Sequence, residues 1–428
     1  MDKLSHFFTK TTREDPQGEE AVNAKLLIRG GFIAKQMAGV YSLLPLGLKV
    51  VNKINNIIRE ELNAIGCQEI LMPALQPKEL WDKTGRWQTG NEVMYQFKDN
   101  SGKDVGLGWT HEEVVTQIAK QFIHSYKDLP KAVYQIQTKF RDEPRAKSGI
   151  LRGREFLMKD LYSFHIDQKD RDEYYQKVSG AYEKIFIRLG LKAIITEASG
   201  GAFSKYSHEF QVAAQSGEDT IYICQKCRYA MNAELISQNS NLKIQNHNEK
   251  LKTVKCPKCG NEMRENKTIE VGNIFKLGTK FSQAIGLLAD DKDGKKVLVE
   301  MASYGIGPTR VMGTIVEVGH DEKGIIWGEN IAPYDVIVVE LRIKNNELRI
   351  ETQEAISELE KAGLEVLLDD RIDVSVGEKL ADAGLIGCPW RIIISQKSLD
   401  QGGVEIKKRS QPESKIVSIP ELIDVIKK

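Results

Sequence analysis

The sequence predicts a chain of mixed helices and strands, α+β overall, that folds into at least two domains. Its 428 residues exceed the size at which a single hydrophobic core stops growing. Two strand-like segments on either side of a charged loop around residue 145 indicate a hairpin. Beyond Ala332-Pro333, strand-like and helix-like segments alternate, which indicates a small C-terminal α/β domain.

The net charge and the cysteine content limit which classes of function are possible. Lys and Arg number 61 against 60 Asp and Glu, a net charge of +1, so any nucleic acid must be bound by local patches and shape. The N-terminus lacks the apolar core of a signal peptide, and no apolar run approaches the roughly 18 residues of a membrane span. We therefore expect a soluble, cytoplasmic protein with no membrane contact. In that compartment, two CxxC pairs among six cysteines suggest metal or redox chemistry rather than disulfides.

The N-terminal third predicts short segments followed by one long helix. A helix and a turn are expected in the tract 29–47, which begins with a Gly-Gly break. From Leu46 to Ile65, apolar residues recur every three or four positions, which predicts an amphipathic helix that ends at Gly66. A strand is expected over residues 69–72. Further along, the pattern predicts a charged helix from Lys169 to Leu189.

Thr110 precedes an apolar-periodic segment that runs to Phe122. From the residues alone, Thr110 is a helix N-cap and Glu113 completes a capping box, an interpretation that needs no ligand.

The hairpin carries the strongest local charge in the chain. Between Ala132 and Glu143 the residues alternate, and the polar face ends in Arg141 and Glu143. From Lys139 to Lys159 there are seven Lys or Arg against three Asp or Glu, which suits a polyanionic ligand because guanidinium groups bind phosphate oxygens bidentately. On the return strand, Arg152 and Phe156 lie four residues apart and are expected to face the same way. The alternative is a solvated basic hairpin.

The two CxxC pairs are Cys224 with Cys227 and Cys256 with Cys259, with 28 residues between them. Two such thiol pairs favour a closed, tetrahedral zinc ribbon, which is structural because four protein ligands leave no open position. Iron and an empty, degenerate ribbon are the alternatives. The polar segment 238–250 is expected to be a flexible loop.

A strand is expected from Ile269 to Leu277, followed by a glycine-rich turn that leads from Ser303 into a helix ending at Val318. Two glycines let the backbone approach a ligand, and Arg310 in the first helical turn faces phosphate. In the C-terminal domain, strands are expected over 334–341, 364–368 and 391–394, and helices over 345–362, 377–385 and 419–427.

In chain order, three of these patterns resemble the signature motifs of class II aminoacyl-tRNA synthetases. The segment Gly66-Cys67 to Pro73 is similar to the first motif, which forms the dimer interface in that family. Phe140-Arg141-Asp142-Glu143 with Arg152 and Phe156 resembles the second, and Gly305-x-Gly307 with Arg310 the third. The resemblance implies an antiparallel-sheet catalytic domain over 1–332, with a zinc-ribbon-like segment at 222–262, and an anticodon-binding domain over 333–428.

The resemblance also implies roles for these residues. In the family, the first arginine of motif two contacts the ATP α-phosphate and the amino-acid carboxylate, the glutamate holds the adenine amino group, and the aromatic ring stacks on adenine. These roles fall on Arg141, Glu143 and Phe156, with Arg152 near the γ-phosphate and Arg310 as a second catalytic cation. ATP is then a substrate, accompanied by Mg²⁺.

Thr110-x-Glu112 resembles the loop with which prolyl-tRNA synthetases hold the imino group of their substrate. A secondary ammonium carries two donors and one positive charge, which a hydroxyl and a carboxylate complement. The resemblance implies a homodimeric ligase that joins proline to the proline tRNA and binds proline through Thr110, Glu112, Arg141 and Ser303. For His208 we expect a structural hydrogen bond, since adenylation needs no protein base. Asn273 stands where family members often have His.

Two other interpretations stay open: a threonyl-type or other class II ligase, and a non-catalytic synthetase-like protein that binds tRNA. The closed set of four cysteines argues against the first, whose zinc has three protein ligands, and intact Arg141, Glu143 and Arg310 argue against the second. Many bacterial prolyl enzymes carry a large editing domain between motifs two and three. The segment 164–301 leaves no room for one, so we expect the short type.

Overall fold

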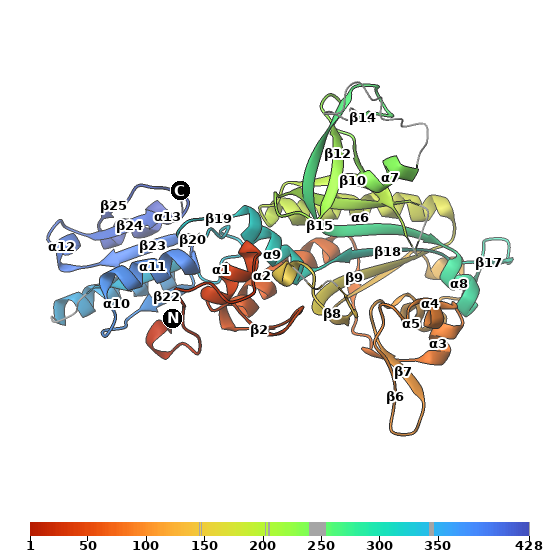
Figure 1. Cartoon of the computed structure of the whole chain (residues 1–428), viewed down its shortest axis with the longest axis horizontal. Helices are drawn as coiled ribbons and strands as arrows, with labels where there is room; N and C mark the ends of the chain where they lie inside the picture. Colours follow the sequence, from red (N-terminus) through yellow and green to blue (C-terminus); the bar gives the residue numbers. More distant parts are fainter. Residues whose placement is uncertain are drawn as a thin grey trace. The chain divides into compact units, whose positions relative to one another are not determined.

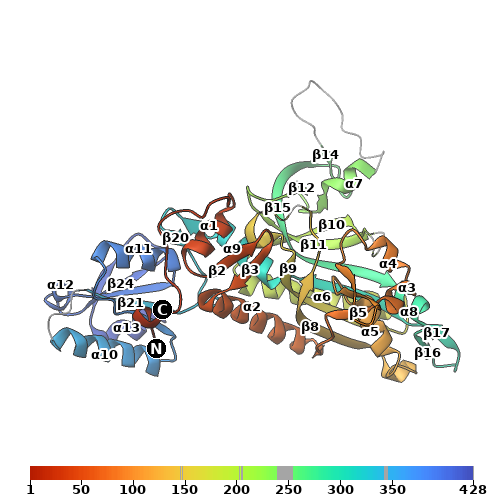
Figure 2. The same ribbon diagram turned by 60° about the horizontal axis from the view of Figure 1, so that its bottom comes forward.

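The computed structural model describes residues 1–144, 146, 148–201, 203, 206–238, 254–341 and 346–427, so the predicted loop at 238–250 lies almost wholly outside the described residues. The chain forms two compact units (Figures 1 and 2): unit 1 contains residues 1–37, 41–54 and 315–428, and unit 2 contains 38–40 and 55–314. The predicted boundary at 332 and 333, which concerns the domains of the family, stays a prediction. None of the described helices combines the length and apolar composition needed to cross a membrane.

Unit 2 is built on a large sheet. Its central strands, β15 (Glu262–Gly278), β18 (Glu300–Ile306), β9 (Glu155–His165) and β8 (Lys131–Phe140), are successively antiparallel. The two-residue strand β4 (Gln68–Glu69) pairs in parallel with β8 at one end. The strands beyond β15 are β10 (Ala193–Ser199), β11 (Tyr206–Ala213), β12 (Asp219–Cys224), β13 (Ala230–Asn232) and β14 (Val254–Lys255). The predicted antiparallel sheet is thus confirmed.

The hairpin β8–β9 turns polar side chains inward. On β8, Gln135 and Lys139 are fully buried, so the polar face found by alternation faces the interior. A solvated basic hairpin, the alternative interpretation, is therefore wrong for this strand. Burying such groups costs free energy unless they find partners, which is typical of a binding site.

Helix α6 (Gln168–Arg188) covers one face of this sheet along β9, β18 and β15 (Figure 1). It begins where the Asp167 side chain accepts a hydrogen bond from the backbone N–H of Asp170 (2.8 Å) and ends before Gly190 at φ +75°, as predicted. Its rings at Tyr182 and Phe186 pack on Phe210 of β11, which fixes the sheet behind the site.

Four local predictions are wrong, and the first two concern residues 29–72. The tract 29–47 holds the end of α1 (Val22–Arg29) and strands β2 (Ile33–Met37) and β3 (Val40–Leu43) instead of a helix and turn. The strand expected at 69–72 is reduced to β4: Gln68 and Glu69 pair with β8 in parallel register, and beyond them the backbone N–H of Ile70 still donates to the carbonyl oxygen of Tyr134 (2.8 Å). Helix α2 (Pro45–Ala64), by contrast, matches its prediction and stops before Gly66 at φ +87°.

The capping box is also wrong. Helix α5 (Glu112–Ala119) starts after His111, which makes no side-chain capping bond, and the Thr110 hydroxyl donates to Glu112 instead. Nor does Arg152 lie on a strand: it follows the 3₁₀ turn η3 (Gly149–Leu151), and β9 begins only at Glu155. The chain is diverted there because the backbone N–H of Arg154 donates to the carbonyl oxygen of Gly39 (2.7 Å).

Unit 1 contains a six-stranded sheet in the order β1, β22, β21, β23, β24, β25. These strands are β1 (Asp2–Lys3), β21 (Val336–Glu340), β22 (Val366–Asp369), β23 (Trp390–Ile394), β24 (Val404–Lys408) and β25 (Lys415–Val417). The first four in the sheet are parallel, and β24 and β25 are antiparallel. Helices α10 (Asn346–Lys361), α11 (Val376–Ile386) and α13 (Leu422–Ile426) complete the predicted α/β pattern, while β1, β24 and β25 were not predicted.

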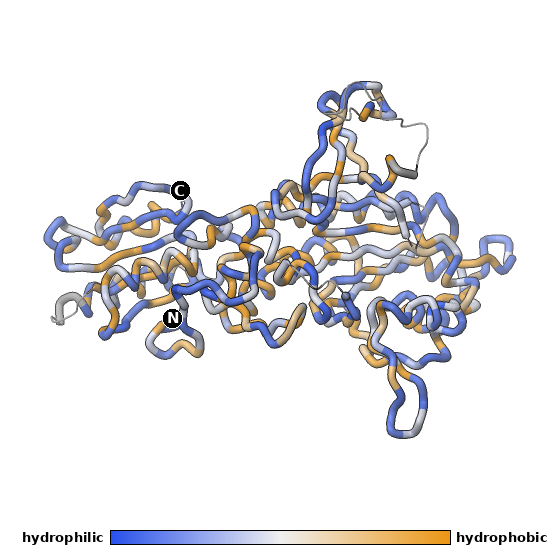
Figure 3. Tube along the Cα trace, in the orientation of Figure 1, coloured by the Kyte–Doolittle hydropathy of each residue, from blue (hydrophilic) through white to orange (hydrophobic). Residues whose placement is uncertain are grey.

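Helix α9 (Pro308–Val318) follows β18 directly, with Pro308 in its first turn as predicted. The remaining elements are short: η1 (Leu4–His6), β5 (Leu75–Pro77), α3 (Lys78–Asp82), α4 (Arg86–Thr89), β6 (Gln96–Lys98), β7 (Asp104–Leu107), η2 (Tyr126–Asp128), α7 (Ala233–Gln238), α8 (Lys280–Ile285), β16 (Leu288–Asp290), β17 (Lys296–Leu298), β19 (His320–Asp321), β20 (Gly324–Ile325), α12 (Gln396–Leu399) and η4 (Ile419–Glu421). Figure 3 shows hydrophobic residues along the sheet strands of both units and hydrophilic ones at the turn between β16 and β17.

Candidate active site and cysteine cluster

A cavity of about 250 Å³ lies in unit 2, between β9, β15, β18 and the first turn of α9. It is lined by every residue that the sequence predicted for ATP or proline binding: Thr110, Glu112, Arg141, Glu143, Arg152, Phe156, Ser303 and Arg310. These residues come from segments far apart in the chain, so their convergence results from the fold. A larger cavity of about 750 Å³ in unit 1 is lined by none of them.

Two guanidinium groups dominate one side of the cavity. Arg141 follows the end of β8, and its burial together with the charge of Arg310 lowers the pKa of Arg141 to about 10. Among the described residues, the buried Nε of Arg141 has no hydrogen-bond partner. Arg310 donates from Nε to the carbonyl oxygen of Leu151 (2.8 Å) and from Nη1 to Glu270 (3.1 Å). Two cations this close, one with an unused donor, make a site for an anion.

The neighbouring part of the cavity combines an ion pair with an aromatic face. Arg152 Nε lies 3.0 Å from Glu143 Oε2, and its Nη1 lies 3.0 Å from Glu218. The Phe156 ring on β9 lies 5.2 Å from the Arg141 guanidinium carbon. A planar heterocycle could stack on such a ring.

Another part of the cavity wall presents a hydroxyl and a carboxylate. Thr110 Oγ1 donates to Glu112 Oε2 (2.5 Å), and Arg86 Nη1 lies 3.3 Å from the same oxygen. Thr110 and Glu112 are buried in the protein, as is Ser303 on β18. A buried carboxylate that lines a cavity attracts a cationic group.

Sequence reasoning missed the residues that support these groups. Glu270 on β15 lines the cavity and accepts hydrogen bonds from Arg310 and from Asn273 Nδ2 (2.9 Å). Lys139 forms a fully buried ion pair with Asp160 (2.9 Å), whose carboxylate also accepts from the Tyr162 hydroxyl (2.9 Å). For Lys139 and Asp160 the only sequence signal is the alternation of polar residues along β8 and β9, which does not reveal their partners.

Two histidines lie close to this network. His111 contacts Lys139 Nζ through Nδ1 (2.9 Å), and burial with that lysine charge lowers the pKa of His111 to about 4, so the ring is neutral at pH 7. His208 on β11 hydrogen-bonds the Tyr175 hydroxyl of α6 (2.8 Å), which confirms the structural bond expected for it.

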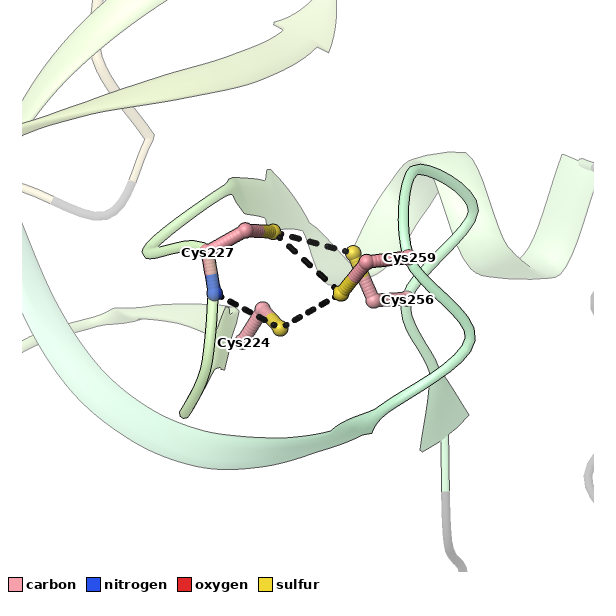
Figure 4. A group of neighbouring side chains, drawn as sticks. All are labelled: Cys224, Cys227, Cys256 and Cys259. Atoms are coloured by element: carbon pink, nitrogen blue, oxygen red, sulfur yellow. Dashed lines mark hydrogen bonds between the residues drawn. The ribbon is translucent and has the colours of Figure 1, made fainter.

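The four predicted cysteines form one cluster at the end of β12 and after β14 (Figure 4). Sγ of Cys224 lies 3.5 Å from that of Cys259, and Sγ of Cys227 lies 3.6 Å from that of Cys256. Disulfide sulfurs lie about 2.05 Å apart, whereas thiolates around one zinc ion, bound at about 2.3 Å in a tetrahedron, lie about 3.8 Å apart. The cluster could therefore hold a metal ion such as zinc.

Comparison with known proteins identifies the class. Residues 95–319 match the family model "tRNA synthetase class II core domain (G, H, P, S and T)", and residues 335–428 match "Anticodon binding domain". The solved structure of Giardia lamblia prolyl-tRNA synthetase in complex with prolyl-adenylate is similar in fold, with a TM-score of 0.76 over 93% of this chain and 74% of that one, at 20% identity. The sheet, the cavity and the two matched models define a class II aminoacyl-tRNA synthetase.

Curated relatives narrow the class to one family. The proline–tRNA ligase of Zymomonas mobilis is 38% identical over 437 residues, which cover 99% of this chain and 98% of the relative. That of Dehalococcoides mccartyi is 34% identical over 557 residues, with the same coverage. The chain belongs to the proline–tRNA ligase family. This membership confirms the predicted ligase class against the threonyl-type and accessory alternatives, and its partners are proline, ATP and tRNA.

The two alignments differ in length. The alignment with the Dehalococcoides enzyme is much longer than the 428 residues of this chain, whereas that with the Zymomonas enzyme is close to it. The former relative therefore has many residues with no counterpart here, in line with the short type.

Proposed function

We propose that the cavity of unit 2 is where proline and ATP react to give prolyl-adenylate and diphosphate, before the prolyl group passes to the terminal adenosine of the proline tRNA. The observation that carries this proposal is Arg141, a buried guanidinium with an unused Nε donor beside the second cation Arg310. An α-phosphate and a substrate carboxylate are the anions that this pair would bind.

At the proline end, the Thr110 hydroxyl and the Glu112 carboxylate would accept the two N–H donors of the imino group. Their mutual hydrogen bond and their burial support this role, since they are already oriented toward one point. Ser303 would complete the wall on β18, and Arg141 would hold the carboxylate.

At the ATP end, Phe156 would stack on adenine, Glu143 would accept from its amino group, and Arg152 would lie near the γ-phosphate. The Arg152–Glu143 ion pair supports this arrangement because it fixes the Glu143 carboxylate beside the ring. A Mg²⁺ ion bound by the phosphates would find a protein ligand in Glu270, whose carboxylate lines the cavity next to Arg310. When bound, it would neutralise phosphate charge.

Catalysis in this proposal rests on charge neutralisation and alignment. The proline carboxylate is already the nucleophile: its oxygen forms a bond to the α-phosphorus while the bond to the departing diphosphate breaks. Arg141 and Arg310 would stabilise the negative charge that builds up on the α-phosphate oxygens. No protein base is required, and His111, neutral and hydrogen-bonded, lies outside the set of lining residues.

Zinc is the metal that we propose for the cysteine cluster, as a structural ion, since four thiolates leave no position for a substrate. We also propose a cytoplasmic homodimer. Support for the dimer comes from β4, a short strand at the end of the sheet, followed by Leu71, which is 77% exposed. An exposed apolar residue beside an unpaired strand edge suits a protein interface. A Leu71→Glu variant that stays dimeric in light scattering would refute this surface.

Proline-dependent exchange of labelled diphosphate into ATP tests the main proposal. Exchange with proline and its loss in Glu112→Gln and Arg141→Ala are expected. A Glu112→Gln variant with an unchanged KM for proline would show that the imino group binds elsewhere.

A further inference from the structure

Arg86 is a buried cation next to the cavity, but it does not line it. It is the first residue of α4, preceded by Gly85 in the left-handed conformation (φ +69°), and its side chain is 7% exposed. Nη1 lies 3.3 Å from Glu112 Oε2 and 3.0 and 3.1 Å from the two carboxylate oxygens of Glu113. One nitrogen thus joins the carboxylate of the cavity to that of the next residue.

Aromatic rings enclose this guanidinium. Its central carbon lies 4.6 Å from the Trp109 ring and 5.1 to 5.3 Å from the other three, which belong to Trp81, Phe203 and Phe281. Phe203 also lines the cavity, whereas Trp81, Trp109 and Phe281 do not. A guanidinium accepts such surroundings because it is weakly hydrated and interacts favourably with ring faces. In a site with little water, its charge acts strongly on both glutamates.

The charges of the cluster do not cancel. Glu112 and Glu113 are the first residues of α5, where free backbone N–H groups favour negative charge, and Arg86 supplies one positive charge. Glu113 is fully buried, takes both of the shorter Arg86 contacts and also accepts from the Thr84 hydroxyl (2.7 Å). Glu112 receives only the longer Arg86 contact. Burial raises the pKa of Glu113, while the charge of Arg86 acts to lower it. With both carboxylates ionised, these three side chains carry one net negative charge, which lies on the carboxylate that faces the cavity.

Among the described residues, the other cations near Glu112 act on it without forming an ion pair with it. Lys139 is ion-paired with Asp160, and Arg141 lies among Arg310, Glu270 and Glu143, although the charges of both also act on Glu112. Lys280 interacts electrostatically with both glutamates, but it is exposed, so solvent screens its charge. Arg86 is the buried cation that contacts both carboxylates.

We propose that Arg86 is a positioning residue for proline recognition: it neutralises Glu113, so that Glu112 keeps a full negative charge for the imino group. This rests on the proposed contact between Glu112 and proline. Without Arg86, the adjacent buried carboxyl groups of Glu112 and Glu113 share one proton. The cavity then loses the full negative charge that pairs with the imino group. Without Glu113, Arg86 pairs with Glu112 alone and competes with the substrate.

A double-mutant cycle tests this proposal. In labelled-diphosphate exchange, Arg86→Met is expected to raise the KM for proline by about 10- to 100-fold, the range of a charge-assisted hydrogen bond, with the KM for ATP nearly unchanged. Glu113→Gln is expected to raise the KM for proline about threefold or more. The double variant R86M/E113Q leaves Glu112 as the one carboxylate of the cluster, with its full negative charge. It is therefore expected to bind proline better than R86M. Two damaging changes that compensate each other indicate charge balance, because independent losses of packing add up.

Arg171 provides a matched control. It forms a similarly buried ion pair with Glu300 (2.5 Å) but does not line the cavity, so Arg171→Met is expected to lower stability and leave the KM for proline unchanged. If R86M does not fold, Arg86→Lys, which keeps the charge, is compared with E113Q and the double variant. A double variant no better than the worse single variant overturns the proposal. An unchanged KM for proline in Glu112→Gln refutes instead the contact on which it rests.

Discussion

The cysteine cluster and the cavity differ in what they leave open to a ligand. The four thiols of the cluster form a closed set that leaves no position for a further ligand. The cavity, by contrast, contains charged groups whose charges the chain does not balance. Around the thiols, sulfurs from two chain segments meet at 3.5 to 3.6 Å. In the cavity, Arg141 lies near the second cation Arg310, and its Nε has no hydrogen-bond partner in the part of the chain that the structure describes. A metal ion bound by the four thiolates would complete the cluster, and the free energy of metal binding would stabilise the folded state. Unbalanced charges in the cavity cost folding free energy until substrates supply the opposite charges. The interactions that then form contribute to substrate binding and catalysis. Substitutions in the two regions should therefore have opposite consequences.

Arg141→Ala gives the largest effect expected on the cavity side. It removes the cation proposed to neutralise the α-phosphate, an interaction that is strongest in the transition state, so proline-dependent exchange should fall by roughly 10²-fold or more. Stability should not fall, because a buried charge beside another cation is lost. Exchange kinetics and thermal unfolding of the same preparation check both statements, and a wild-type exchange rate would end the assignment.

Cys224→Ser should behave in the opposite way. One thiolate fewer leaves an incomplete tetrahedral site, so the bound metal, about one zinc per chain, should be lost with at least about 2 kcal/mol of the free energy of unfolding. Adenylation at a temperature where the variant stays folded should change little. Metal analysis by mass spectrometry and denaturant unfolding measure the two effects, with Cys67→Ser, a buried cysteine outside the cluster, as the control. Wild-type protein prepared without chelators that contains no thiophilic metal would contradict the prediction.

Thr110→Val gives a smaller and more selective effect. It keeps the volume of the side chain but removes one acceptor for the imino group, worth about 1 to 1.5 kcal/mol, so the KM for proline should rise roughly tenfold. The KM for ATP should not change, since Thr110 lies at the proposed proline end. Equal changes in the two KM values would show that Thr110 acts on the cavity as a whole.

The same contrast explains what could be predicted from the sequence. The cysteine cluster depends on two short spacings, and helices such as α2 and α6 depend on local periodicity and glycine stops. The two-residue strand β1 exists only because Asp2 pairs with Leu367, a partner that no local pattern indicates. The C-terminal strand β24 was missed between an expected strand and an expected helix.

For the cavity, the resemblance to the family motifs identified the residues that are expected to contact substrates. It did not identify the residues that balance the charges of those residues. Glu270 meets Arg310 across 40 residues, and Arg86 meets Glu113 across 27. The Gly-Arg-Trp sequence at 85–87 was the available signal, and it says nothing about a partner. The capping box failed because spacing cannot decide whether the Thr110 hydroxyl bonds the helix backbone or a neighbouring carboxylate.

The last prediction concerns a reaction that should not occur. Between β9 and β18, the described residues belong to α6, the strands of the sheet, the cysteine cluster and the short elements α7, α8, β16 and β17. The described residues here include one small separate core, made of Cys224, Met231, Leu235, Val254, Cys256 and Met263 beside the cysteine cluster, which is too small to house an editing site. Alanine is smaller than proline, and a pocket rejects a smaller substrate only through lost contacts, about 1 to 3 kcal/mol per methylene-sized group. We therefore expect this chain to form alanyl-adenylate at a measurable rate but not to deacylate proline tRNA mischarged with alanine, a task left to a separate protein. Alanine-dependent diphosphate exchange measures the first reaction, and incubation of the purified protein with preformed alanyl-tRNA measures the second. Deacylation well above the buffer rate that persists in Arg141→Ala would reveal an editing site outside the cavity.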